Sequence, residues 1–232
     1  MREIRKNFKG NAREIVLGPL FKLAEAILEL LVPLVTASII EFRRFLCGLD
    51  GAPMINPGSG SLADDIASMI PPDLWPEFVL PYWEEHYRAS TTGRRSAHVE
   101  DLRPAQLPYL EDIGLWRYDP SISPKLTPRL VAAGCRVPFQ WRLGSFHLRE
   151  MDLRDVEDFA YQAAADGASA VFMVTEASLC HESDVRKIQA FISAAKDAKA
   201  MIGAGLNRGE VGERVSPSGK AKFWDHWSGY KG

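Results

Sequence analysis

The apolar positions divide the chain into one long helical stretch and a later series of short apolar runs that alternate with amphipathic helices. The helical stretch is predicted from Phe21 to Cys47, and Gly48 follows it where a left-handed residue commonly ends a helix. Its cleanest apolar part, residues 30–40, is shorter than the roughly 20 residues that cross a bilayer. We therefore expect a buried helix in a cytoplasmic protein that has no contact with a membrane.

Five short apolar runs are candidate β-strands: Ala52–Ile55, Ser96–Glu100, Leu115–Tyr118, Val137–Leu143 and Ser169–Thr175. Helices are predicted between and after them, over residues 73–88, 104–113 and 128–134, and from the N-cap residues Asp152 and Ser183 onward. Alternation of strands and helices at this spacing predicts right-handed βαβ units and a parallel sheet.

The predicted domain organisation has three parts. A basic N-terminal segment covers residues 1–20, an α/β domain covers residues 21–202, and a loose tail covers residues 203–232. The tail is rich in Gly, Lys and Arg, so we expect little regular structure in it. Its aromatic residues either dock on the domain or belong to a frayed end; they are Phe223, Trp224, Trp227 and Tyr230.

The composition is that of an ordinary globular domain, with 232 residues of which 46% are hydrophobic. The 28 basic and 30 acidic residues give a net charge of −2, which supplies no electrostatic reason to expect nucleic acid as a partner. The three cysteines, Cys47, Cys135 and Cys180, are too few for a disulfide framework and fit a reducing compartment.

Residues able to carry chemistry occur at three places near the ends of predicted strands. They are His98 with Glu100, Glu176 with Cys180 and His181, and the pair Asp64 and Asp65. Alternation along a strand places His98 and Glu100 on the same face. Because His, Glu and Cys are all zinc ligands, three of them with one open position would make a catalytic zinc site.

Each of these residues also has a structural interpretation. His98 and Glu100 are equally explained as a hydrogen-bonded pair, and Glu176 as a partner that orients the imidazole. Asp64 and Asp65 fit a helix cap or a solvated loop. Cys47 and Cys135 are interpreted as small buried apolar residues.

Three segments resemble the uroporphyrinogen decarboxylase superfamily, which includes the zinc-dependent methyltransferases of corrinoid proteins. They are residues 62–82 (LADDIASMIPPDLWPEFVLPY), His98-Val99-Glu100, and Cys180 with the helical residues 185–195. The resemblance runs from about Glu25 to Ala200. Members are (β/α)8 barrels, and the methyltransferase branch holds zinc with His-x-Cys and a later cysteine. The resemblance therefore implies His98 and Cys180 as ligands, with Glu100 in place of the first cysteine.

The function implied by this resemblance is methyl transfer between a corrinoid on a partner protein and a small thiol. Zn²⁺ held by His98, Glu100 and Cys180 would deprotonate the thiol. Glu176 would orient or supplement the ligands, and Asp64 or Asp65 would line the mouth of the site.

Two alternatives stay open. A carboxy-lyase of the uroporphyrinogen decarboxylase type would need cationic side chains for its substrate, from the set Arg94, Arg95, Arg117, Arg136, Arg142 and Arg149. The chain departs from that pattern, since Pro71 stands at the turn serine of the family and residues 203–205 lack its histidine. The other alternative is a non-catalytic half-barrel that serves as a remnant or an assembly partner.

Five predicted strands are too few to close an eight-stranded barrel. The sequence therefore predicts a partial (β/α)8 TIM barrel of about five parallel strands with flanking helices. Its open edges would need cover, so we expect a homo-oligomer or a complementary half-barrel on another chain.

Overall fold

The computed structural model describes residues 12–176, 179 and 181–222, and the chain divides into two compact units. Unit 1 comprises the residues up to Leu62 together with Met69–Arg95, and unit 2 comprises Ala63–Ser68 and the residues from Ser96 onward. The division passes through the first two strands of the chain.

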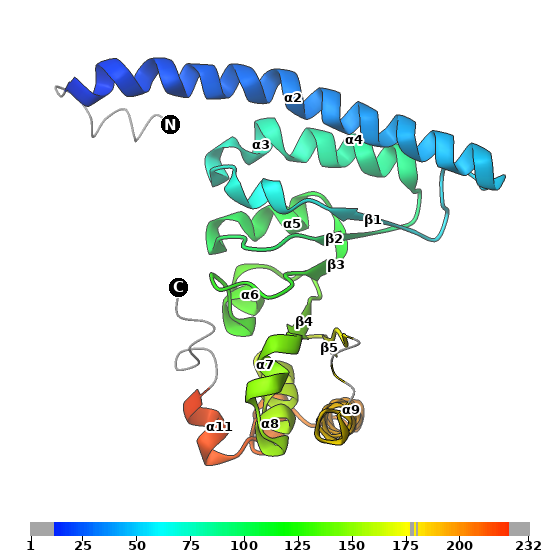
Figure 1. The fold of residues 1–232 in the computed structure, drawn as a ribbon, viewed down its shortest axis with the longest axis vertical. Helices are drawn as coiled ribbons and strands as arrows, with labels where there is room; N and C mark the ends of the chain where they lie inside the picture. Colours follow the sequence, from blue (N-terminus) through cyan, green and yellow to red (C-terminus); the bar gives the residue numbers. More distant parts are fainter. Residues whose placement is uncertain (1–11, 177–178, 180, 223–232) are drawn as a thin grey trace. The chain divides into compact units, whose positions relative to one another are not determined.

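Unit 1 is mainly helical. Its helices are α2 (Ala12–Asp50), the 3-10 helix η2 (Pro72–Leu74), α3 (Trp75–Phe78) and α4 (Leu80–Ser90). The helix α2 packs on α3 and α4 (Figure 1). Beneath it, the buried rings of Trp75 and Trp83 meet edge to face with centroids 5.4 Å apart, a favourable aromatic geometry.

The helix predicted from Phe21 is confirmed, but its predicted burial is wrong. Of the large apolar side chains of α2, Ile40 is buried, while Leu30 and Phe45 are 70% and 60% exposed. An apolar run without a polar face does not indicate which solvent surrounds it, and this is why the sequence interpretation failed here.

The first strand is β1 (Ser59–Ala63), and the strand predicted at Ala52–Ile55 is wrong. Glycines explain the difference, because they allow a backbone approach that a side chain would block. A Cβ at Gly93 would lie 2.2 Å from the carbonyl oxygen of Gly58, and a Cβ at Gly60 would lie 2.6 Å from Cγ2 of Thr91. A segment whose Gly and Ser residues are typical of a loop therefore forms β1.

The other four strands lie where the sequence predicts them. They are β2 (Arg94–His98), β3 (Leu115–Asp119), β4 (Gln140–Leu143) and β5 (Ala170–Met173). The sheets are small, with strand orders β1-β2-β3 and β4-β5, and β4 and β5 are parallel, with Gln140 opposite Ala170. A parallel bridge between Tyr118 and Phe139 links β3 to β4. The fold is thus α/β with two small parallel sheets; this sequential order is consistent with part of a (β/α)8 barrel, and the described residues close none.

The helices of unit 2 are η1 (Asp65–Met69), η3 (Pro104–Gln106), α5 (Pro108–Asp112), α6 (Pro128–Gly134), α7 (Ser145–Glu150), α8 (Leu153–Ala165), α9 (Glu182–Gly203), α10 (Arg208–Gly212) and α11 (Pro217–Lys222). Asp152 caps α8 as predicted, in a reciprocal arrangement with Asp155. His181, and not Ser183, occupies the N-cap position of α9. The helices α8 and α9 pack side by side (Figure 1).

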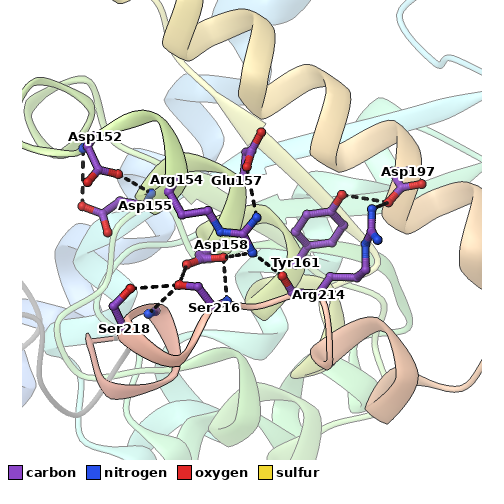
Figure 2. A network of polar contacts seen from close by, with 11 residues as sticks. Asp152, Arg154, Asp155, Glu157, Asp158, Tyr161, Asp197, Arg214, Ser216 and Ser218 are labelled. Carbon is purple, nitrogen blue, oxygen red and sulfur yellow. Dashed lines mark hydrogen bonds and ion pairs between the residues drawn. The ribbon is translucent and has the colours of Figure 1, made fainter.

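The described part of the predicted loose tail contains the short helices α10 and α11 and is held in place. Asp158 of α8 is fully buried and accepts hydrogen bonds from the backbone N–H of Ser216, at 2.9 Å, and from its hydroxyl (Figure 2). Arg154 lies 2.7 Å from the same carboxylate. A buried carboxylate needs such partners, so it ties the segment before α11 to α8. The four aromatic residues from Phe223 onward lie outside the described residues.

Candidate functional site

The candidate site of unit 2 is built from the carboxyl ends of neighbouring parallel strands. His98 is the last residue of β2, and Asp119 is the last residue of β3. Arg142 lies next to the end of β4. The carboxyl ends of parallel strands meet at one edge of a sheet, where α/β proteins commonly place their binding residues.

Asp119 fixes the imidazole of His98. Its Oδ2 lies 2.9 Å from Nδ1 of His98 and 3.4 Å from Nη2 of Arg142, while its Oδ1 accepts the backbone N–H of Ser121 at 2.9 Å. A carboxylate accepts and does not donate, so Nδ1 carries the proton, and in the neutral ring Nε2 is left as an acceptor. With 28% of the His98 side chain and 14% of the Asp119 side chain exposed, the pair is partly shielded from water.

The free edge of the imidazole faces two further carboxylates. Nε2 of His98 lies 3.6 Å from Oε1 of Glu100 and 4.0 Å from Oδ1 of Asp65. The same oxygen of Asp65 accepts the backbone N–H of Glu100 at 2.9 Å, which ties η1 to the residues after β2. The site is therefore an imidazole with one carboxylate at Nδ1 and two more carboxylates near Nε2.

The structure brings together three of the residues that the sequence singled out: His98, Glu100 and Asp65. Asp64 acts locally, since its Oδ1 accepts the backbone N–H of Ala67 at 3.2 Å and its own N–H donates to the carbonyl of His98 at 3.1 Å. This fits the helix-cap interpretation of that residue.

Glu176 contacts α7. Its carboxylate accepts a hydrogen bond from the hydroxyl of Ser145 and lies 3.3 Å from Nη2 of Arg149. The residue that orients His98 is Asp119. Cys180, the third predicted metal ligand, lies outside the described residues.

Among residues 12–176, 179 and 181–222, no group of three or more His, Cys, Asp or Glu side chains is placed to hold a metal ion. The described residues alone therefore do not make the predicted zinc site. One feature of such a site is present, because metal-binding histidines commonly donate their second N–H to a carboxylate, as His98 does to Asp119.

Sequence reasoning missed Asp119, although a signal was available. Asp119 follows directly after the predicted strand Leu115–Tyr118, and the strand-end argument that selected His98 applies to it equally. Arg142 was considered only as a binding group for substrate carboxylates. Its guanidinium stacks over the ring of Phe172, 5.1 Å from the centroid, and its Nε finds no acceptor among the described residues.

Two neighbouring groups are held in their neutral forms by burial. Burial raises the pKa of Tyr118 well above its usual range, and its hydroxyl donates to the carbonyl of Val99 at 2.9 Å. Burial also raises the pKa of the Cys135 thiol, which confirms that residue as a small buried side chain. Cys47 is only half-buried.

Comparisons with known proteins add little to this geometry. No family model and no curated protein matches the chain, so the superfamily resemblance stays a prediction. Among solved structures, a methyltransferase from Methanosarcina mazei is similar with a TM-score of 0.45 and 13% sequence identity, over 60% of this chain and 42% of that one. The chain thus spans less than half of that methyltransferase, and neither a family nor an activity follows from a likeness of this size.

Proposed function

We propose that unit 2 carries a histidine-centred site that withdraws a proton from a small thiol, so that the sulfur accepts a methyl group. The observation that carries the proposal is the orientation of His98. Its Nδ1 lies 2.9 Å from Asp119, which leaves Nε2 as an acceptor at the strand ends. A positioned imidazole is the usual group for such a proton transfer.

The step is balanced as follows. The S–H bond of the thiol breaks and its proton goes to Nε2 of His98. The sulfur lone pair then forms the S–CH3 bond, while the bond between the methyl group and its carrier breaks and leaves its electron pair on the carrier. Asp119, Glu100 and Asp65 favour the imidazolium that forms, because opposite charges within a few ångströms stabilise it.

The metal predicted from the sequence remains part of the proposal, and it depends on Cys180. His98, Glu100 and Cys180 would hold Zn²⁺, which would supply the positive charge that lowers the pKa of a bound thiol. In that case Nε2 of His98 would be a ligand and not the proton acceptor, so metal content separates the two forms of the site.

The carrier and the partners are proposals as well. A corrinoid on a second protein is the methyl donor that the sequence resemblance implies. Among the described strands β5 pairs with β4 alone, and a largely apolar groove of about 700 Å3 lies between β5 and α9. A strand with one unpaired edge beside an apolar groove supports the proposed second copy or complementary half-barrel.

The contacts do not favour the carboxy-lyase alternative. Three of the arginines that it would need are paired with carboxylates in unit 2, since Arg136 binds Glu111, Arg149 binds Glu176 and Arg142 binds Asp119. Their charges are therefore already balanced by carboxylates of the protein.

The test is a methyl-transfer assay on the full chain, with methylcobalamin as donor and a small alkyl thiol as acceptor, followed by the absorbance of the cobalt product. Loss of a general base typically costs a factor of about 10²–10⁴, and we expect losses of this size in His98→Ala and Asp119→Asn. Glu111→Gln, which breaks a surface ion pair with Arg136, is the matched control and keeps its activity. Equal rates in His98→Ala and the wild type would contradict the proposal.

Elemental analysis of the same preparations decides the role of the metal. About one zinc per chain that is lost in both His98→Ala and Cys180→Ser would establish the metal form of the site. A folded wild type with neither zinc nor methyl transfer would leave the non-catalytic half-barrel as the better account.

A further inference from the structure

The surface of α2 is unusual for a helix in water. Large apolar side chains are exposed from Leu23 to Leu49; they are Leu23, Ile27, Leu30, Leu31, Leu34, Val35, Ile39, Phe42, Phe45, Leu46 and Leu49. Monomeric proteins in water rarely expose a contiguous apolar surface of this kind unless something covers it.

The exposed side chains do not form one stripe. Consecutive pairs such as Leu30 and Leu31, or Leu34 and Val35, point in different directions around a helix with 3.6 residues per turn. A helix that is apolar on nearly all sides is typical of a surrounding hydrocarbon phase, whereas a helix that binds one protein groove has a single apolar face.

The length and charge of the segment fit a bilayer. Residues 22–50 include 18 consecutive residues with no more than two charged side chains. At 1.5 Å per residue they extend about 27 Å, close to the roughly 30 Å of bilayer hydrocarbon. In residues 23–40 the two charges are Glu25 and Glu29, near one end. Pro33 within the segment is tolerated in membrane-spanning helices.

Basic residues stand on both sides of this segment. Lys22 precedes it, and Arg43 and Arg44 follow it. Long basic side chains at such positions reach the headgroups while their stems cover apolar surface. The residues before Lys22 are also rich in basic side chains: Arg2, Arg5, Lys6, Lys9 and Arg13. They complement the negative charge of anionic lipids.

The packing of unit 1 marks where the apolar segment ends. A groove of about 650 Å3 between α2 and α4 has a charged lining; it begins at Ala37 and includes Glu41, Arg44, Glu84, Glu85 and Arg88. Glu84 and Arg88 form an ion pair there, with N and O 2.8 Å apart. Such a lining belongs in water, so the turn from Ala37 to Ile40 lies at the boundary between the apolar and the aqueous environment.

We infer that residues 23–40 of α2 cross a lipid bilayer and anchor the chain to a membrane. This replaces the sequence interpretation of a buried helix in a cytoplasmic protein, because these side chains are exposed. The inference is independent of the proposed chemistry in unit 2.

The first test is fractionation of cells that express the full chain, followed by a wash of the membranes in sodium carbonate at high pH. We expect the protein to stay in the membrane pellet and to float with the lipid in a sucrose gradient. Release by carbonate, or sedimentation without lipid, would overturn the inference. So would a mature chain that begins after residue 50, because the segment would then be a cleaved signal.

Paired variants test the apolar surface itself. Leu30→Glu with Leu34→Glu places two charges in the middle of the segment, and we expect most of the protein to leave the membrane fraction. Leu30→Val with Leu34→Val is the matched control and stays in it. If the wild type is instead a water-soluble oligomer that the Glu variant dissociates, a second copy covers α2 and the inference is wrong. His98→Ala is expected to fractionate as the wild type does, which separates this test from that of the site.

Discussion

The helices α2 and α8 contain similar apolar residues and use them in opposite ways. In α8, Val156, Phe159 and Ala160 are fully buried and form one face, while Arg154 and Glu157 remain partly exposed on another. In α2, Leu30, Leu31 and Leu34 are all exposed although they point in different directions around the helix. The helix α8 is thus built for an interface between protein and water. The surface of α2 requires a different surrounding phase, which the apolar count of either helix does not reveal.

The largest difference in the free energy of unfolding is expected between two Phe→Ala variants, one in each helix. Phe159→Ala removes a fully buried ring from α8 and is expected to lower the free energy of unfolding by about 3–5 kcal/mol. Phe45→Ala removes an exposed ring, and its effect is expected to be within about 0.5 kcal/mol. Denaturant titration of both variants measures the difference. Equal losses would show that the end of α2 around Phe45 packs into a protein core.

The buried carboxylate of α8 gives the next prediction. Asp158→Ala leaves the donors of Ser216 and the guanidinium of Arg154 without their acceptor, which is expected to cost about 3 kcal/mol. Glu157→Ala removes the exposed partner of Arg154 and is expected to cost less than about 1 kcal/mol. Amide hydrogen exchange of α11 is expected to become faster in Asp158→Ala. Unchanged protection of α11 in Asp158→Ala would show that this carboxylate does not hold the segment.

A pH-dependent effect is expected from His147 of α7. Burial lowers its pKa to about 4, so below its ordinary value near 6.5 the unfolded chain takes up a proton that the folded chain does not. The stability that neutral His147 contributes is present above pH 6.5 and is lost as the pH falls towards 4. The free energy of unfolding is expected to fall by about 2 kcal/mol between pH 7 and pH 5. His147→Leu should lose this part of the pH dependence, as measured by denaturation at the two pH values. An identical slope in wild type and variant would rule out His147 as its source.

The smallest effect concerns the start of α8. Asp152 accepts the backbone N–H of Asp155 at 2.8 Å, and Asp152→Ala is expected to cost about 1 kcal/mol. Asp152→Asn keeps an acceptor oxygen and should retain most of that stability, which thermal unfolding of the two variants checks. If Asp152→Asn lost as much stability as Asp152→Ala, the negative charge of Asp152, and not its capping hydrogen bond, would be the source of that stability.

The sequence predicted those features that depend on local patterns. Strands β2 to β5 and the Asp152 cap follow from alternation and capping rules. The approach of His98 to Glu100 was predicted from alternation, but β2 ends at His98 and Glu100 lies in the turn that follows. β1 was missed because its glycines serve a close approach to residues far along the chain, which no local rule describes. Asp119 was missed for a related reason, since its role depends on which strand lies beside β2.

The environment of α2 could be inferred only after the structure showed that its apolar side chains are exposed. The prediction rested on the short apolar run of residues 30–40, which contains Pro33, Thr36 and Ser38 and is by itself too short to span a bilayer. All three are compatible with a helix in lipid, where Ser and Thr can satisfy their hydroxyls on the helix backbone, as Ser38 does on the carbonyl of Leu34 at 2.7 Å.

The most direct test of the contrast between the two helices is amide hydrogen exchange of the full chain, with and without vesicles that contain anionic lipid. We predict that residues 23–40 exchange much more slowly when vesicles are present, while α8 exchanges at the same rate in both samples. Equal exchange of residues 23–40 in the two samples would contradict the account, because their apolar surface would then not lie in lipid.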